Sequence, residues 1–203
     1  MRLKPVEGLE FFEHSHRYRF RGQWIDHSIT QVIDDKTDAV RQIIEDTRHE
    51  WEPRGNFVHD WLDHWLTTGK EGPMGDFAEW IKPLRDLGLW SRYDVVATEF
   101  AMVDPRYSIA GKFDVLLQHK TSGDIVLADL KTLSERGRPR NIEPQLGGYL
   151  ILLGQTFPEM EVKRCLGIWA KPGECVTTTY DAMSCWISFE AARRAFLKNQ
   201  PDC

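Results

Sequence analysis

The chain has 203 residues, of which 41% are hydrophobic and 28% charged, and its net charge is −5. This balance is typical of a soluble globular protein with one sizeable core. No apolar run approaches the ~20 residues that a membrane span needs. Acidic residues also interrupt the N-terminal segment, where a signal peptide would be apolar. We therefore expect a cytoplasmic protein with a single domain over residues 1–203.

The negative net charge argues mildly against a passive nucleic-acid coat protein. It does not exclude an enzyme that acts on nucleic acid, because such an enzyme can gather carboxylates around divalent cations that face the phosphate. The four cysteines lie at 165, 175, 185 and 203. They lack the close spacing of zinc or iron–sulfur ligands, so we expect reduced, partly buried thiols.

The first part of the chain, residues 1–90, predicts a hairpin followed by helices. Two β-prone runs within 16–33 flank Arg21-Gly22-Gln23, which predicts a hairpin turn. Apolar residues at helical spacing predict a helix from Val40 to Trp51. The stripe in RGNFVHDWLDHWL at 54–66 predicts a second helix.

A third helix is expected from Asp76, because Glu79 stands three residues later as in a capping box. The second part of the chain, residues 91–203, changes to strand-like segments. These segments are 93–103, 108–118, 124–132, 162–170 and 174–180. Helices are expected over 141–154 and 189–199. The order predicts an α/β sandwich with a mixed sheet and no repeated βαβ winding.

Three charged residues stand where strands normally bury apolar side chains, namely Asp114, Asp129 and Lys131. A lone buried carboxylate costs several kcal/mol, so such groups are normally paired or bound to metal. Asp129 and Lys131 are two residues apart and therefore point to one face of a strand. The short turn between their strand and the preceding one can bring Asp114 beside them. A buried ion pair without chemistry is the alternative interpretation.

Other polar residues accompany this group along the chain. His59 lies at the edge of an apolar helical stripe, where it could also be a core histidine. Gln145 and Tyr149 are one helical turn apart and share a face, although they could also be rim residues.

Together these residues resemble a known family. RGNFVH at 54–59, AGKFD at 110–114, DLKT at 129–132 and QLGGY at 145–149 resemble the four ordered signatures of RecB-like nucleases in the PD-(D/E)XK superfamily. Those signatures are a helix with G-x-x-x-H, strands with G-x-x-D and D-x-K-T, and a helix with Q-x-x-x-Y. HSITQVI also resembles the opening of phage-type and bacterial exonucleases of this superfamily.

The resemblance implies a restriction-endonuclease-like core: a three-layer sandwich with a central mixed β-sheet flanked by helices, preceded by an N-terminal hairpin and helices. It implies a deoxyribonuclease dependent on Mg²⁺ or Mn²⁺, with one or two ions. It favours an exonuclease of DNA repair, recombination or phage-type DNA processing. DNA and a recombination or repair protein are the implied partners.

The resemblance also assigns roles to residues. Asp114 and Asp129 would ligate the metal with the Leu130 carbonyl, and His59 would complete a second metal position. Lys131 would orient or deprotonate the attacking water and stabilise charge on the phosphate. Gln145 and Tyr149 would position the DNA strand or the metal ligands.

Two further groups are weighed against simpler interpretations. Glu99 matches an acidic residue often found on the strand before G-x-x-D, but it could be an exposed strand carboxylate. Arg136, Arg138 and Arg140 follow the catalytic strand and suit DNA phosphates, unless they form a solvated loop.

The cysteine spacing disfavours the relatives that carry an iron–sulfur cluster, so no such cluster is expected. Another metal-dependent phosphoester hydrolase is one rival interpretation, but the chain lacks an HExxH motif or a third dense acidic cluster. A non-catalytic DNA-binding or scaffolding relative is the other rival. The presence of Asp114, Asp129 and Lys131 together argues against it.

Overall fold

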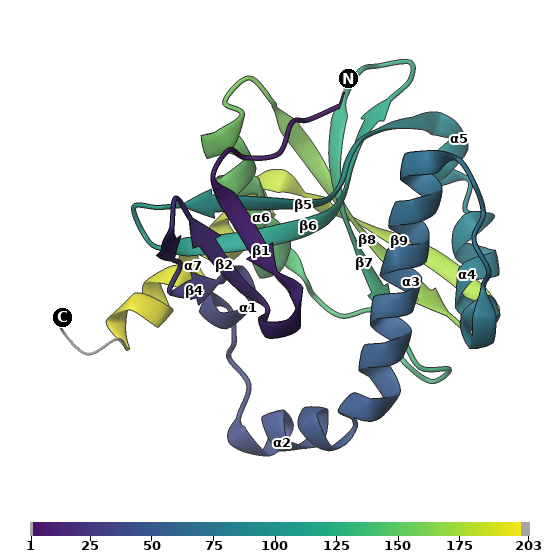
Figure 1. Ribbon diagram of the computed structural model, residues 1–203, viewed down its shortest axis with the longest axis horizontal. Coiled ribbons are helices and arrows are strands. Elements are labelled where there is room, and N and C mark those ends of the chain that lie inside the picture. The colour runs from purple at the N-terminus through teal and green to yellow at the C-terminus, as the bar shows by residue number, and fades with distance from the viewer. Residues whose placement is uncertain (1, 200–203) are drawn as a thin grey trace.

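The structure is a computed structural model that describes residues 2–199 (Figure 1). A small antiparallel sheet near the N-terminus has the strand order β1-β2-β3. It consists of β1 (Leu9–Phe12), β2 (Arg17–Phe20) and β3 (Gln23–Trp24), with the 3-10 turn η1 (Glu13–Ser15) between the first two.

The turn between β2 and β3 lies at Arg21 and Gly22, whose φ angles are 49° and 82°. Both values lie in the left-handed region that hairpin turns of two residues require. The predicted hairpin is therefore present, although Gln23 belongs to the strand and not to the turn. The strand β1 was not predicted.

The next two elements lead from the small sheet to the main one. They are β4 (His27–Ser28) and α1 (Ile29–Val32). Ser28 and Gln31 form a capping box: the Ser28 hydroxyl accepts the Gln31 N–H, and the Gln31 side chain accepts the Ser28 N–H at 2.7 Å. This reciprocal pair satisfies backbone donors at the start of a very short helix.

The main sheet has the order β4-β6-β7-β8-β9, and β5 pairs with β6. Its long strands are β5 (Tyr93–Asp104), β6 (Ile109–His119), β7 (Ile125–Thr132), β8 (Val162–Lys171) and β9 (Glu174–Asp181). The β4–β6 and β7–β8 pairs are parallel, and the other pairs are antiparallel. The mixed sheet predicted from the sequence is confirmed.

Helices cover both faces of this sheet (Figure 1). One core cluster joins the sheet to α1, α6 (Glu143–Thr156) and α7 (Ala182–Lys198). The other joins it to α3 (Arg48–Thr68), α4 (Ala78–Arg85) and α5 (Leu89–Arg92). The predicted three-layer α/β sandwich is therefore confirmed, with its site-bearing strands between two apolar layers.

Several helix boundaries differ from the predictions. The helix predicted from Val40 to Trp51 is divided: α2 (Asp38–Asp46) ends before Thr47, and Trp51 lies in α3. The predicted capping box at Asp76 is wrong, because α4 follows the 3-10 turn η2 (Gly75–Phe77) and no side chain caps it. The last helix begins at Ala182, seven residues earlier than predicted, because Asp181 accepts the Ser184 N–H as its cap.

Among the cysteines, Cys165 and Cys185 are buried, Cys175 is partly buried and none of the three is in a disulfide. Cys203 lies outside the described residues. No helix within residues 2–199 combines the length and the apolar character that crossing a bilayer requires.

Candidate active site

The main sheet forks where β6 and β7 separate. Their antiparallel pairing runs from the turn as far as Val115 and Ala128, and the next residue of β6 is Asp114. The Asp114 carboxylate accepts the Leu130 N–H at 2.5 Å. A side chain thus takes the place of the next ladder hydrogen bond, and Asp114 is held inside the fork with only 8% of its surface exposed.

Asp129 and Lys131 lie on β7 at the same fork. Lys131 Nζ is 2.6 Å from Asp129 Oδ2, and Asp129 is only 1% exposed. Burial raises the pKa of Asp129 to about 6, with a further contribution from the Asp114 carboxylate, while the Lys131 ammonium opposes the shift. The ammonium is therefore held against a carboxylate that protonates more readily than an exposed one.

A hydrogen-bonded pair of side chains on α6 connects to the Asp129 carboxylate of β7. Gln145 Nε2 donates to Asp129 Oδ1 at 3.2 Å and to Tyr149 Oη at 2.8 Å. Burial, and then the charge of Asp129, raises the Tyr149 pKa well above its usual range. Tyr149 is thus a neutral hydroxyl, and because its oxygen accepts from Gln145, its own proton is available to another acceptor.

Gly111 lets this helix approach β6. A Cβ at Gly111 would lie 2.6 Å from Ile29 Cδ1 and 3.1 Å from Tyr149 Cε1. Any larger residue would force the Ile29 side chain, and to a lesser extent the Tyr149 ring, to move. The glycine three residues before Asp114 therefore has a packing role beside the site.

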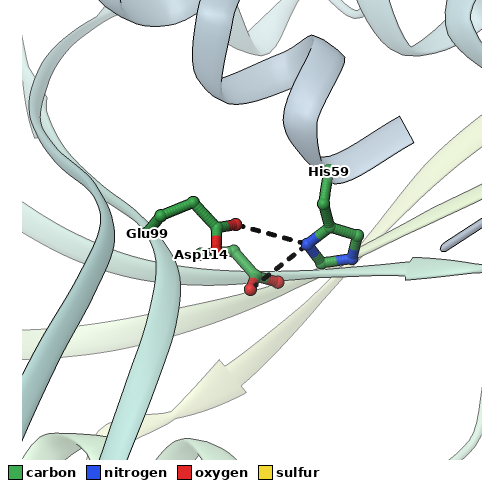
Figure 2. Close-up of side chains that lie close together, drawn as sticks. All are labelled: His59, Glu99 and Asp114. Atoms are coloured by element: carbon green, nitrogen blue, oxygen red, sulfur yellow. Dashed lines mark hydrogen bonds and ion pairs between the residues drawn. The ribbon is translucent and has the colours of Figure 1, made fainter. Parts of the chain in front are cut away.

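The remaining polar residues converge on Asp114 from the opposite side (Figure 2). His59 comes from α3, and its Nδ1 lies 3.4 Å from both Glu99 Oε1 and Asp114 Oδ1. Burial lowers the pKa of His59, but the charges and hydrogen bonds of Asp114 and Glu99 outweigh it and raise the pKa to about 10. In turn, burial raises the Asp114 pKa, but His59, Lys131 and the Leu130 N–H lower it below its usual value. His59 is therefore an imidazolium between two carboxylates.

Glu99 reaches His59 because β5 is irregular at this position. Glu99 has φ 45°, in the left-handed region, and it lies between the cross-strand pairs Thr98–Val115 and Phe100–Phe113. Non-glycine residues rarely adopt this conformation, and it tends to be found at functional sites. Ala97 and Phe100 both pack in the same core cluster although they are three residues apart. The strand thus changes face around Glu99.

Lys112 is a site residue that the sequence analysis missed. Its ammonium forms an ion pair with the second oxygen of Glu99. Burial lowers the Lys112 pKa, but Glu99 raises it by more. Lys112 and Asp114 are spaced like Asp129 and Lys131, so the two-residue spacing on a strand was the available signal.

Arg54 is a second residue that was missed. It lies on α3 one turn before His59, and its Nε donates to Thr132 Oγ1 at 3.3 Å at the end of β7. Its guanidinium lies 5.4 Å from the centroid of the Trp80 ring. Arg54 therefore places a positive charge beside the strand that carries Asp129 and Lys131.

The three arginines predicted to contact DNA are exposed, unlike the buried residues of the fork. Arg136, Arg138 and Arg140 are exposed on the connection between β7 and α6. Within residues 2–199, none of their side chains forms an ion pair. They lie on the segment that follows the site-bearing strand β7.

Comparison with known proteins identifies the family of this chain. The sequence profile of the PD-(D/E)XK nuclease superfamily matches residues 10–176. The chain therefore belongs to the PD-(D/E)XK nuclease superfamily. A comparison with curated proteins gives no match. Among solved structures, one titled "Crystal structure of SSO0001" is similar, with a TM-score of 0.47 and 13% identity over 86% of this chain and 76% of that chain.

Nucleases of this superfamily typically use divalent metal ions, and the fork offers suitable donors. One ligand atom each from His59, Glu99 and Asp114 lie within 4.8 Å of one another. Imidazole nitrogen and carboxylate oxygen atoms are common ligands of such ions. Asp129 lies outside this group of three, and its buried Oδ2 is held in an ion pair by the Lys131 ammonium. The donor set therefore fits a divalent cation.

Proposed function

We propose that this protein is a Mg²⁺- or Mn²⁺-dependent deoxyribonuclease of the RecB-like branch that hydrolyses DNA phosphodiester bonds. The observation that carries the proposal is the group of buried, oppositely charged side chains at the fork of β6 and β7. Asp114, Asp129 and Lys131 meet there with His59 and Glu99, in a chain that belongs to a nuclease superfamily.

His59, Glu99 and Asp114 would hold the metal ion, with Asp129 and the Leu130 carbonyl as further ligands. When bound, a divalent cation lowers the pKa of a ligated water and acts as a Lewis acid on a phosphoryl oxygen. Binding through His59 requires that its imidazolium lose a proton.

The other residues act on the substrate, on the attacking water or on the Asp129 carboxylate. Lys131 is held by Asp129, so its ammonium is fixed where it can orient the attacking water and stabilise negative charge on the phosphate. Gln145 fixes one oxygen of Asp129, while the other oxygen holds the Lys131 ammonium. The Tyr149 hydroxyl can donate its proton to a DNA oxygen. Arg136, Arg138 and Arg140 would contact backbone phosphates next to the fork.

The test is cleavage of labelled linear DNA, single- and double-stranded, by the purified chain in Mg²⁺, Mn²⁺ or EDTA. We expect cleavage only with a divalent cation. Asp129→Asn and Lys131→Ala should each slow it by about a thousandfold or more, which is the loss expected for a term of several kcal/mol. Exposed matched controls are Asp94→Asn and Lys163→Ala, which should cut like the wild type. Undiminished cleavage by Lys131→Ala would contradict the proposal.

We further propose that the enzyme is an exonuclease of DNA repair, recombination or phage-type DNA processing, working with a recombination or repair protein. The support is the resemblance of its signatures to the RecB-like branch. Covalently closed circular DNA should resist the enzyme while linear DNA of the same sequence is degraded. Rapid cutting of the closed circle would assign an endonuclease instead.

A further inference from the structure

The small N-terminal sheet has two chemically different faces. Cross-strand register pairs Phe11 with Tyr18 on one face, and this face packs in a core cluster against β5 and β6. The opposite face carries the alternate residues of all three strands. It is here called the arginine–aromatic face, and its residues are Glu10, Phe12, Arg17, Arg19 and Trp24.

The side chains of this face are stacked on one another. The Arg17 guanidinium lies 4.4 Å from the centroid of the Trp24 ring, and the Arg19 guanidinium lies 5.1 Å from that of Phe12. The Phe12 and Trp24 rings are 5.1 Å apart. Trp24 is nevertheless 44% exposed. Planar cations and aromatic rings thus alternate on an open surface.

One of the two arginines on this face has no ion-pair partner in the part of the chain that the structure describes. Arg19 has a carboxylate partner, Glu10, at 2.6 Å. Arg17 forms no ion pair among residues 2–199, although the whole chain carries a net charge of −5. An exposed cation–π contact stabilises a protein by only ~0.5–1 kcal/mol. An exposed tryptophan beside an unpaired arginine is the combination that binds single-stranded nucleic acid, where bases stack and phosphates pair with cations.

The small sheet that carries this face borders the strands of the candidate active site. In Figure 1, β1 and β2 lie across β5 and β6, which carry Glu99 and Asp114. His16, which lies between η1 and β2, lines a cavity of about 210 Å³ together with Tyr18, Lys112 and Tyr149. Lys112 pairs with Glu99. The core-facing side of the small sheet thus lines this cavity, and the arginine–aromatic face lies on the opposite side of the same strands.

We propose that the arginine–aromatic face binds single-stranded DNA, with bases stacked on Trp24 and Phe12 and phosphates on Arg17 and Arg19. This inference names the form of the substrate and in that respect rests on the proposed nuclease function. The binding itself requires no cleavage, so the two can fail separately.

The test measures the affinity of the full chain for a fluorescein-labelled oligothymidylate in EDTA, by anisotropy. Trp24→Ala should weaken binding about tenfold, because base stacking on one aromatic side chain has that magnitude. Arg17→Ala should weaken it and reduce the slope of log K against log salt by about 0.7, as expected for one lost phosphate contact on a single strand. Trp24→Phe keeps an aromatic ring and should restore most of the affinity.

Matched controls lie on α7, on a different element. Trp186 is 45% exposed, and Arg194 is also exposed. Trp186→Ala and Arg194→Ala should bind like the wild type. Melting temperatures of all variants identify any loss of folding. If Arg17→Ala disturbs the hairpin, Arg17→Lys is used instead as the variant that retains the positive charge.

An oligomer of abasic phosphodiester units separates stacking from charge. On this probe, Trp24→Ala and the wild type should bind equally, whereas Arg17→Ala should still be weaker. The inference is overturned if Trp24→Ala binds oligothymidylate like the wild type, or if a blunt duplex shows the same dependence on Trp24. Loss of cleavage with retained Trp24-dependent binding would overturn only the nuclease proposal.

Discussion

The two halves of the candidate active site reach the same fork by different routes. Asp129 and Lys131 lie on β7, where pairing with β8 continues without a break from Val126 to Thr132. Asp114 lies where the ladder between β6 and β7 has ended, and Glu99 lies at an irregular position of β5. Asp129 and Lys131 form the regular half of the site, because they lie on a regular strand. Asp114 and Glu99 form the irregular half, because their positions depart from regular strand pairing.

The difference has a physical origin. In a regular strand, alternate residues share a face, so Lys131 must lie beside Asp129 whatever the rest of the chain does. A residue with φ 45° such as Glu99 needs surrounding structure to hold it, and here His59 and Lys112 bind its carboxylate from α3 and β6. We therefore expect the regular half to tolerate changes in packing that disturb the irregular half.

The largest effect should come from Asp114, which belongs to the irregular half and also accepts the Leu130 N–H of β7. Asp114→Asn should reduce cleavage by about a thousandfold or more, because it removes a buried metal-binding charge. The matched control is Asp104→Asn, since Asp104 is also buried on the same sheet but pairs with Arg106. Steady-state cleavage rates test this, and equal loss in both variants would indicate damage to the sheet and not to the site.

The support of the regular half by α6 can be tested at two glycines. A Cβ at Gly147 would lie 1.9 Å from the Cys185 carbonyl oxygen on α7, whereas nothing lies within 4 Å of a Cβ at Gly154. Gly147→Ala should destabilise the protein by about 3 kcal/mol through overpacking. Gly154→Ala should stabilise it by up to ~1 kcal/mol through helix propensity. Chemical denaturation measures both, and similar effects of the two substitutions would refute close α6–α7 packing.

Metal binding should show which half holds the cation. Mg²⁺ or Mn²⁺ at about a hundred times its dissociation constant should stabilise the fold by about 2.7 kcal/mol, seen as a higher Tm. Glu99→Gln should reduce this shift if the group of His59, Glu99 and Asp114 binds the ion. Asp129→Asn tests the other half by the same measurement. A shift that is lost in Asp129→Asn and intact in Glu99→Gln would move the metal site to β7.

The smallest effect concerns the pH dependence of the metal-free protein. The folded pKa of His59 is about 10 and its ordinary value is 6.5, so between these values the folded state holds a proton that the unfolded state has released. Stability should therefore fall as the pH rises. From about pH 7 to about pH 8, before most unfolded cysteines titrate, we expect a loss of about 1 kcal/mol in EDTA.

The control is His59→Gln, which cannot titrate and should have a nearly flat profile over this interval. Urea denaturation at each pH measures the change. A wild-type profile that rises with pH would contradict the imidazolium between Asp114 and Glu99.

Much of this protein follows from local sequence patterns. Alternation on β7 predicts that Asp129 and Lys131 share a face, and helical spacing predicts that Gln145 and Tyr149 do. The sandwich and its mixed sheet follow from the order of apolar segments, because each segment must bury its apolar face against another. The helix boundaries around Thr47 and Ala182 were less predictable, since caps and breaks are decided by a few hydrogen bonds.

The sequence by itself determined the residues of the regular half and the layers that enclose them. Only the tertiary structure decided that His59 meets Glu99 as well as Asp114, that Lys112 joins them, and that Asp114 accepts the Leu130 N–H. These contacts join segments distant along the chain at an irregular point of the sheet. Periodicity describes regular elements and is lost where a strand changes face, so the packed fold alone could place them.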